Sequence, residues 1–247
     1  MDEEDKFFYD VLHFPEEKPI HVKVRSIVGL IPIFAVEVLE PELLERVPRF
    51  NEHLDWILEN RPELASLVSR WNEPGRGHRH LFSLLRGSRL KCLLRRMLDE
   101  DEFLSSYGIR SMSKIHEKHP YVLHCEGKTK HCNGSSKVDY QPAESNTHMF
   151  GGNSNWRGPI WFPVNFLLIE SLQRFHHYYG SDFKVESPFT SGQKLTLEDV
   201  AEDISNRLGD LFRRDDQGHR PLYTHHPDIH LNPQFKDCIW FYEYFHG

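Results

Sequence analysis

The chain has 247 residues and a formal net charge of −7, which argues against general nucleic-acid binding because that binding needs a basic surface. Hydrophobic residues make up 38% of the chain and aromatic residues 13%, enough to bury a sizeable core and to exclude extended disorder. The sequence contains neither a signal peptide nor an apolar run of membrane length, so we expect a cytoplasmic protein without membrane contact.

The first 60 residues predict a small β-hairpin followed by two helices. Residues 7–14 and 21–26 alternate in polarity around a proline-flanked turn, which is typical of a hairpin. The apolar run 27–39, with Pro32 in its early turns, predicts a buried inner helix. Residues 42–60 predict a more polar outer helix that is kinked or divided at Pro48.

Residues 70–96 reverse the charge of the chain locally, with seven Arg and one Lys against a single acidic residue, Glu73. One interpretation is a site for an anion or a sugar phosphate. The other, which we favour, is a solvated helix whose cations pair with the acidic run 99–102. At the start of the segment, Trp71 and Asn72 precede a Pro-Gly turn and suit a loop that lines a sugar cavity.

Residues 126–146 are polar and poorly periodic, which indicates either a lid over a site or an ordinary surface connection. A zinc site could be assembled nearby from two histidines and two cysteines, but their spacing matches no common structural pattern. These residues are His124, Cys125, His131 and Cys132. We therefore expect neither a metal ion nor another cofactor, and the unpaired cysteines agree with a reducing compartment.

The run from Gly151 to Pro163 reads Gly-Gly-Asn-Ser-Asn-Trp-Arg-Gly-Pro-Ile-Trp-Phe-Pro and precedes a predicted helix. Trp156 and Trp161 offer ring faces that can cover the C–H face of a pyranose, while Arg157 offers paired donors for hydroxyls or a carboxylate. The glycines let the backbone approach a ligand closely. The alternative is a glycine-rich loop whose Trp residues anchor a core.

The helix predicted over residues 162–179 carries an apolar stripe that faces a core. Asn165 lies within that stripe, one turn from Trp161. An asparagine in an apolar stripe needs a polar partner, and this one could reach the same cavity as the Trp-Arg loop.

The last fifty residues predict another helix and then an aromatic segment. Thr196 and Asp199 resemble a capping box at the start of a helix over residues 197–211. In the final segment, 237–247, Glu243 stands among aromatic and imidazole side chains. Apolar surroundings would raise the pKa of a carboxyl group toward the range useful for proton transfer, although a surface Glu on an aromatic-rich strand is the alternative.

Two of these motifs carry a family resemblance. Gly-Gly-Asn-x-Asn-Trp-Arg-Gly-Pro-Ile-Trp over 151–161, followed by Phe-Tyr-Glu-Tyr-Phe over 241–245, resembles glycoside hydrolase family 63, especially its microbial glucosidase-like branch. Mannosylglycerate hydrolases and trehalases, which are related (α/α)6 glycosidases, share the Trp-Arg-Gly-Pro core. Similarity over 7–10 and 103–111 extends the resemblance to nearly the whole chain.

The resemblance implies an all-α chain, an incomplete (α/α)6 toroid with the small hairpin near its amino terminus. It also implies inverting hydrolysis of an α-glycosidic bond, in which one carboxylic acid protonates the leaving oxygen and a carboxylate activates water. Glu243 matches the base of the family. Trp156 and Arg157 match residues of the sugar subsite, with Trp161 close behind them and Asn165 one turn further.

The acid of the family is an Asp in a motif resembling Ser-Gly-x-Asp-Asn-Ser, which does not occur in this sequence. A complete toroid needs twelve helices and roughly 400 residues at ordinary lengths. We therefore expect residues 1–247 to form a single partial catalytic domain, truncated at both ends, that is inactive in isolation. Turnover by this chain alone would redirect the search for an acid to Asp10, Glu73 or Asp139.

The sequence thus predicts a glycosidase that cleaves an α-glucosidic or α-mannosidic bond in an oligosaccharide or small glycoside. The alternative is a non-catalytic or degenerate carbohydrate-binding fragment that lacks the acid. A scaffold that associates through its basic segment is a third possibility. We expect no nucleic-acid partner, and we expect self-association if inner-helix surface such as 27–39 is left exposed.

Overall fold

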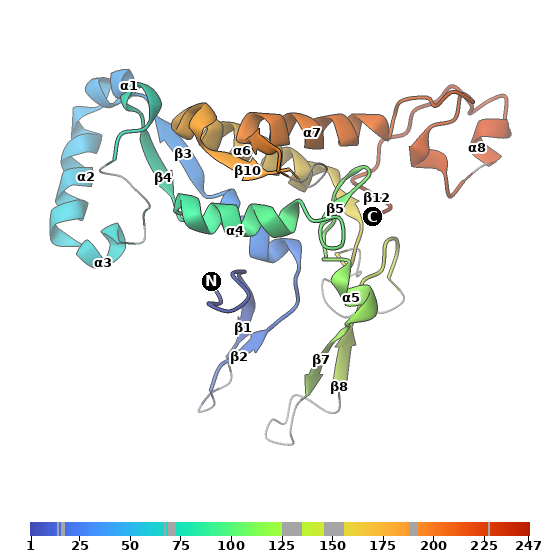
Figure 1. Ribbon diagram of the computed structural model, residues 1–247, viewed down its shortest axis with the longest axis horizontal. Helices are drawn as coiled ribbons and strands as arrows, with labels where there is room; N and C mark the ends of the chain where they lie inside the picture. The colour runs from blue at the N-terminus through green and yellow to red at the C-terminus, as the bar shows by residue number, and fades with distance from the viewer. Residues whose placement is uncertain are drawn as a thin grey trace. The chain divides into compact units, whose positions relative to one another are not determined.

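A computed structural model describes residues 1–13, 15, 18–66, 68, 73–124, 135–145, 156–187, 192–226 and 228–247 (Figure 1). Helices of all kinds account for 42% of these residues and strands for 17%. The prediction of an all-α, incomplete (α/α)6 toroid is therefore wrong. The described residues contain six two-stranded antiparallel sheets, and β3 of one sheet lies in an apolar run that was predicted to be a helix.

The α-helices within the described ranges are α1 (Pro41–Arg46), α2 (Pro48–Asn60), α3 (Pro62–Ala65), α4 (Gly87–Met97), α5 (Ile115–Lys118), α6 (Phe162–Tyr179), α7 (Leu197–Asp210) and α8 (Asp228–Leu231). Four 3-10 helices accompany them: η1 (Ile27–Ile33), η2 (Arg76–His78), η3 (Gly180–Asp182) and η4 (Pro221–Tyr223). The strands pair as β1 (Asp10–Leu12) with β2 (Ile20–Val22), β3 (Val36–Leu39) with β4 (His80–Ser83), β5 (Leu104–Ser105) with β6 (Gly108–Ile109), β7 (Tyr121–His124) with β8 (Ser135–Val138), β9 (Ile160–Trp161) with β12 (Tyr244–Phe245), and β10 (Lys184–Glu186) with β11 (Lys194–Thr196).

The chain divides into two compact units, one formed by residues 1–29, 96–166 and 203–247 and the other by residues 30–95 and 167–202. The division does not test the single domain predicted over residues 1–247, which stays a prediction. Among the described residues no helix combines the length and the hydropathy needed to cross a membrane.

The second unit contains the clearest departure from the predicted helices. The run 27–39 was expected to be one inner helix, but it forms a 3-10 helix around Pro32 and then strand β3. Val36 of β3 lies opposite Ser83, and Leu39 lies opposite His80. Alternating β-branched side chains pack well on a pleated surface, which explains why this short run prefers a strand.

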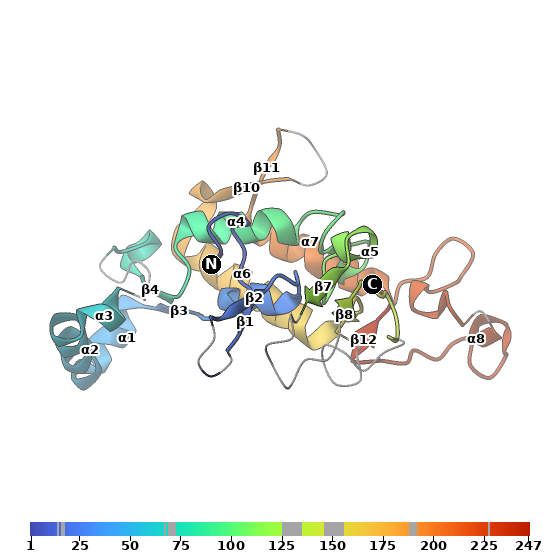
Figure 2. The ribbon, with the colours of Figure 1, turned by 90° about the horizontal axis from the view of Figure 1, so that it is seen from below.

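Two other predictions for the second unit, a division of the outer helix at Pro48 and a capping box before α7, agree with the structure. Pro48 divides the predicted outer helix into α1 and α2, as expected. At the start of α7, the Asp199 amide donates to Thr196 Oγ1 at 3.2 Å and the Thr196 amide donates to Asp199 Oδ2 at 2.8 Å, so the capping box is confirmed. Figure 2 shows β10 and β11 as neighbouring strands just before α7. The unit buries an aliphatic core that includes Leu81, Leu85, Leu90, Leu93, Leu94, Leu168, Leu172, Phe175, Val200 and Ala201.

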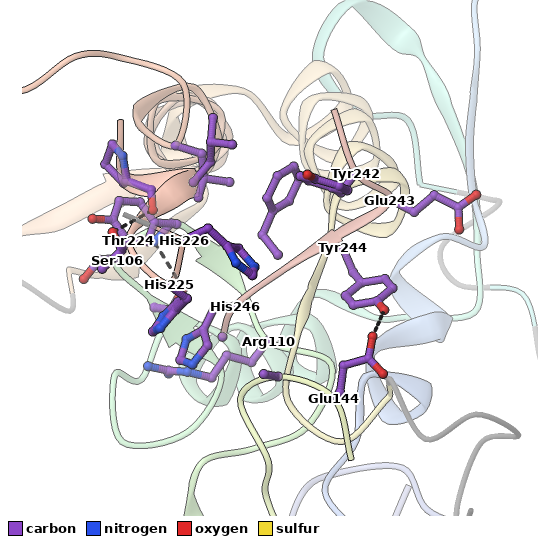
Figure 3. A pocket seen from close by; sticks show the side chains of 18 residues that line it. Ser106, Arg110, Glu144, Thr224, His225, His226, Tyr242, Glu243, Tyr244 and His246 are labelled. Carbon is purple, nitrogen blue, oxygen red and sulfur yellow. Dashed lines mark hydrogen bonds between the residues drawn. The ribbon is translucent and has the colours of Figure 1, made fainter. Parts of the chain in front are cut away.

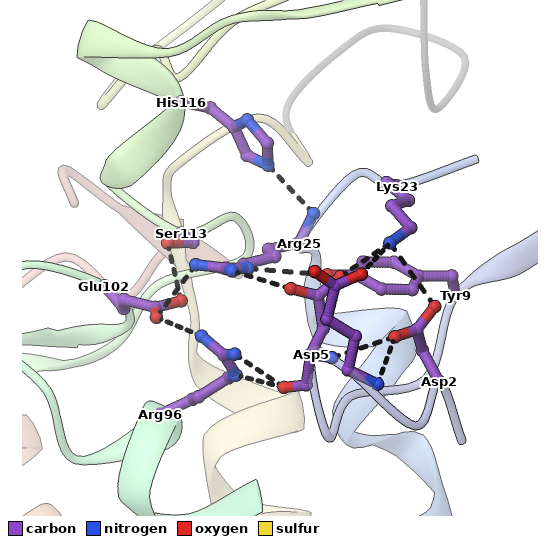
Figure 4. Close-up of polar contacts among 10 residues, drawn as sticks. Asp2, Asp5, Tyr9, Lys23, Arg25, Arg96, Glu102, Ser113 and His116 are labelled. Carbon is purple, nitrogen blue, oxygen red and sulfur yellow. Dashed lines mark hydrogen bonds and ion pairs between the residues drawn. The ribbon is translucent and has the colours of Figure 1, made fainter. Parts of the chain in front are cut away.

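In the first unit, a polar network anchors the predicted amino-terminal hairpin, which is confirmed as β1 and β2 (Figure 4). The buried Glu102 carboxylate accepts hydrogen bonds from Arg25 Nη1 at 3.1 Å, Arg96 Nη1 at 2.6 Å and Ser113 Oγ at 3.1 Å. Arg25 also reaches Asp5 Oδ1 at 3.3 Å. The pairing of Arg96 with Glu102 supports the interpretation of the basic segment as an ion-paired helix.

Candidate functional site

Pairing of β9 with β12 brings the two motifs of the family resemblance together in the first unit. Tyr244 lies opposite Trp161, and Phe245 lies opposite Ile160. The Phe162 amide, at the start of α6, donates to the Glu243 carbonyl at 2.8 Å. A cluster of rings fixes the second strand: Phe162, Phe212, Phe241 and Phe245 contact one another with centroid distances of 5.0 to 6.2 Å.

Aromatic side chains of the two strands and of the turn before β9 form a stack. The Trp156 and Trp161 rings are nearly parallel, with a centroid distance of 4.0 Å and an interplanar angle of 2°. The Tyr244 ring follows at 5.1 Å from Trp161. Both Trp residues are half-buried, so each retains exposed ring surface. Half-exposed, rigid aromatic faces suit contact with the apolar face of a sugar.

Arg157 is only 1% exposed, and its guanidinium forms an ion pair with Asp139. Its Nε donates to the Asp139 carbonyl at 3.1 Å and its Nη1 to Ser145 Oγ at 3.2 Å. Burial raises the pKa of the Asp139 carboxyl, but the charge of Arg157 and the hydrogen bonds from Lys137 and Gln141 outweigh that effect and hold the pKa below its usual value. Arg157 therefore ties its loop to residues 139–145.

Asn165 is fully buried and joins α6 to the backbone of β6 and β9. Its Oδ1 accepts from the Ile109 amide at 2.7 Å, and its Nδ2 donates to the carbonyls of Ile109 at 3.0 Å and Trp161 at 2.9 Å. The polar partner that an asparagine in an apolar stripe requires is thus the backbone of a neighbouring strand. Asn165 does not line the cavity described next.

A cavity of about 810 Å³ opens beside β12 in the first unit (Figure 3). Glu243 and Glu144 both line it, together with Tyr242 and Tyr244. The Glu243 side chain is exposed, and in Figure 3 it extends away from the histidine side chains of the opposite wall. Trp156, Arg157 and Trp161 are not among the lining residues, although β9 carries Trp161 next to Tyr244 of β12.

Tyr244 holds one of the two carboxylates of the cavity, that of Glu144. Its hydroxyl donates to Glu144 Oε1 at 2.7 Å. Burial, this hydrogen bond and the negative charges of Glu144 and Glu243 together raise the pKa of Tyr244 to about 12. The phenol therefore stays protonated at neutral pH and holds the Glu144 carboxylate in place.

The opposite wall of the cavity carries residues that the sequence analysis did not single out, namely Arg110, His225, His226 and His246. The imidazoles of His225 and His246 stack with a centroid distance of 4.1 Å. Burial lowers the pKa of His246, and the neighbouring His225 lowers it further. No motif marks these residues or Glu144, because they converge only through contacts between distant segments.

Several candidate residues fall outside the described part of the chain. Trp71 and Asn72, predicted to line the sugar cavity, lie there. So do Cys125, His131 and Cys132 of the possible zinc site, residues 126–134 and 146 of the possible lid, and the glycines that precede Trp156. Within the described residues, no group of three or more His, Cys, Asp or Glu side chains could hold a metal ion.

Comparisons with known proteins give one strong and one distant similarity, and no family model matches the chain. Over 248 residues the chain is 46% identical to the uncharacterized protein YMR196W of Saccharomyces cerevisiae, a match that covers 99% of this chain and 22% of that protein. Over 170 residues it is 24% identical to a probable mannosyl-oligosaccharide glucosidase of Schizosaccharomyces pombe, covering 64% of this chain and 16% of that protein. The chain thus spans about a fifth of the length of the curated relatives it matches, and it is similar, at low identity, to a probable glucosidase.

Proposed function

We propose that this chain contributes the base and part of the sugar site of a glycoside hydrolase. The reaction is inverting cleavage of an α-glucosidic or α-mannosidic bond in an oligosaccharide or small glycoside. The pairing of β9 with β12 carries the proposal, because it joins Glu243 to the aromatic stack of Trp156, Trp161 and Tyr244 beside one cavity. The distant similarity to a probable glucosidase supports the same reaction class.

In this proposal Glu243 is the general base. Its exposed carboxylate can accept a proton from a water molecule as that water attacks the anomeric carbon. The ring faces beside it exclude water from one side of the sugar and orient it through C–H contacts. An inverting site also needs a carboxylic acid on the opposite face of the scissile bond, about 6.5 to 9.5 Å from the base.

Glu243→Gln tests the role of the base. The amide keeps the shape of the side chain but cannot accept the proton. In a chain extended by the upstream segment expected to carry the acid, we therefore expect kcat for an α-linked disaccharide to fall by about 10² to 10⁴-fold with KM little changed. Proton NMR of the first product formed should show inversion at the anomeric carbon. The matched control is Glu52→Gln, an exposed helix position in the second unit, which should change neither constant.

A second candidate function, carbohydrate binding without turnover, is favoured by the absence of the Ser-Gly-x-Asp-Asn-Ser motif from the sequence. Isothermal titration with the same disaccharides separates the two candidates. Binding without any released sugar, in the chain extended by the upstream segment as well as in residues 1–247, would support the binding function and exclude the proposed catalysis. Absence of both binding and turnover would contradict both candidates, and retention of configuration would contradict the inverting role of Glu243.

A further inference from the structure

The cavity beside β12 has two chemically different sides. Figure 3 shows Glu144 and Tyr244 on one side and Arg110, His225 and His246 on the other. The carboxylate side suits acid–base chemistry on a sugar. The guanidinium and imidazole side has no role in the proposed hydrolysis, and its chemistry is that of an anion site.

Arg110 is a buried cation whose hydrogen-bond partners among the described residues are uncharged. The residue is 8% exposed, and its Nη1 donates to the carbonyls of Glu100 at 3.1 Å, Glu102 at 3.3 Å and Leu104. Among the residues that the structure describes, no carboxylate lies within ion-pair distance of this guanidinium, and its Nε has no hydrogen-bond partner. Buried charges are normally paired, so an uncompensated guanidinium in a cavity wall attracts an anion.

The two stacked imidazoles add donors to the same wall. At a centroid distance of 4.1 Å, His225 and His246 cannot both carry a positive charge without strong repulsion. An anion placed against both rings removes that repulsion. The hydroxyls of Ser106 and Thr224 also line the cavity and can donate to the anion oxygens.

We propose that Arg110, His225 and His246 form a subsite for an anionic group, a phosphate monoester or a carboxylate, on the ligand of this cavity. A guanidinium that is held rigidly by backbone carbonyls is well suited to such groups, because its fork is already oriented. The assignment of the anion to a charged glycoside rests on the proposed function. The anion subsite itself does not.

Titration of the full chain with inorganic phosphate tests the subsite. We expect His225→Gln and His246→Gln each to weaken phosphate binding about tenfold or more, since hydrogen bonds to charged groups are worth that much. Arg110→Lys keeps the charge but loses the fork, and we expect it to weaken binding as well. His53→Gln, an exposed position on α2, is the matched control and should bind phosphate like the parent chain.

The pH dependence provides a second readout. His226, Glu144, Glu243, Tyr107, Tyr242 and Tyr244 are the other titratable groups that line the cavity. Anion binding should raise the pKa of His246, measured from its imidazole C–H resonances. Sulfate, whose charge does not change over this range, should bind more tightly at pH 6.0 than at pH 7.5. At the same subsaturating phosphate concentration, the shift of His246 should be smaller in His225→Gln.

Glucose 6-phosphate, glucuronate and glucose distinguish the sources of the anion. If glucose 6-phosphate binds most tightly, the anion is a phosphate monoester. If glucuronate binds most tightly, the anion is a carboxylate. Equal binding of these two ligands and glucose would overturn the proposal. Affinity for phosphate within twofold of the parent in all three cavity variants would also overturn it. Glu243→Gln should bind phosphate normally even where it removes hydrolysis, so failure of the proposed hydrolysis and failure of the anion subsite are distinguishable.

Discussion

Gly158 is the residue of the Trp-Arg-Gly motif that packing constrains most tightly. A Cβ atom added there would lie 2.2 Å from the Gln141 carbonyl oxygen and 2.9 Å from the Tyr140 ring. On its other side the backbone approaches Gly247, where an added Cβ would lie 2.1 Å from the Gly158 oxygen. The Gly158 amide donates to Ser111 Oγ at 3.1 Å, so the backbone cannot shift freely to make room.

We expect Gly158→Ala to lower the free energy of unfolding by about 1 to 3 kcal/mol, the usual cost of overpacking, because the nearest atom is backbone. Urea unfolding followed by circular dichroism measures the change. Gly209→Ala is the matched control. Its added Cβ would meet only Arg213 at 3.5 Å, and inside α7 it should stabilise the chain by about 0.5 to 1 kcal/mol. Equal effects of the two substitutions would show that Gly158 is not constrained.

At the scale of single residues, the sequence predicted which types of side chain gather near the site better than it predicted which side chains contact one another. Residue types alone indicated an aromatic and cationic cluster, and Trp156 does stack on Trp161. The ion pair of Arg157 with Asp139 joins residues 18 positions apart, and no periodic pattern marks such a pair. The same reason kept Glu144 and His225 out of the predicted site. The roles assigned to Glu243 and the Trp-Arg pair stay predictions.

The elements that sequence periodicity predicted well are the long ones. Helix α6 covers residues 162–179 as predicted, and α7 begins at its predicted capping box, because each offers several turns of apolar spacing. Strands such as β9 and β12 contain two residues each, too few for any period to be detected. Their pairing, which joins the two motifs, is therefore visible only in the structure.

The contacts of helix α5 depend on a histidine, His116, in its neutral form. His116 Nε2 accepts a hydrogen bond from the Arg25 amide at 2.9 Å, while its Nδ1 lies 3.0 Å from the His119 carbonyl (Figure 4). Only the neutral ring can accept at Nε2. Burial lowers the pKa of His116 below its ordinary value of 6.5, and the charge of Arg25 lowers it further.

Because the unfolded chain then binds this proton more readily, the stabilisation is fully present above pH 6.5 and is lost as pH falls through the lowered pKa. We expect the free energy of unfolding to fall by about 1 kcal/mol between pH 7.5 and 5.5 in the parent chain. His116→Gln keeps an acceptor without a proton equilibrium, so its decrease should be smaller. An identical pH profile in both chains, measured by urea unfolding, would refute the role of His116.

At the scale of the whole chain, neither compact unit is formed by one continuous stretch of sequence. Three segments form the first unit and two segments form the second. Helices α4, α6 and α7 each begin in one unit and end in the other. Both relatives extend far beyond the matched region, which equals 22% and 16% of their lengths. Exposed apolar runs on the chain are where contact with another protein surface is expected.

Among the residues described by the structure, the longest run of consecutive exposed large apolar side chains lies just before Glu243. Ile239 is 54% exposed, Trp240 36%, Phe241 60% and Tyr242 45%. Self-association through the inner stripe 27–39 stays a prediction: Leu30 and Ile33 of that stripe are fully buried, while Val28 and Ile31 are 40% and 48% exposed. We define residues 239–242 as the carboxyl-terminal apolar run and predict that self-association of the chain, if it uses apolar surface, occurs there.

Sedimentation equilibrium tests this prediction over a range of chain concentrations. Burying one large aliphatic side chain is worth about 1.5 to 3 kcal/mol, so Ile239→Gln should weaken dimerisation by about tenfold or more. Trp56→Gln is the matched control, because Trp56 is 57% exposed on α2 in the other unit and should leave the association constant unchanged. Equal weakening by both substitutions would mean that association follows total exposed apolar area and not the carboxyl-terminal run. A strictly monomeric parent chain at every concentration would show that 54% exposure of Ile239, with its apolar neighbours, is not sufficient to drive association.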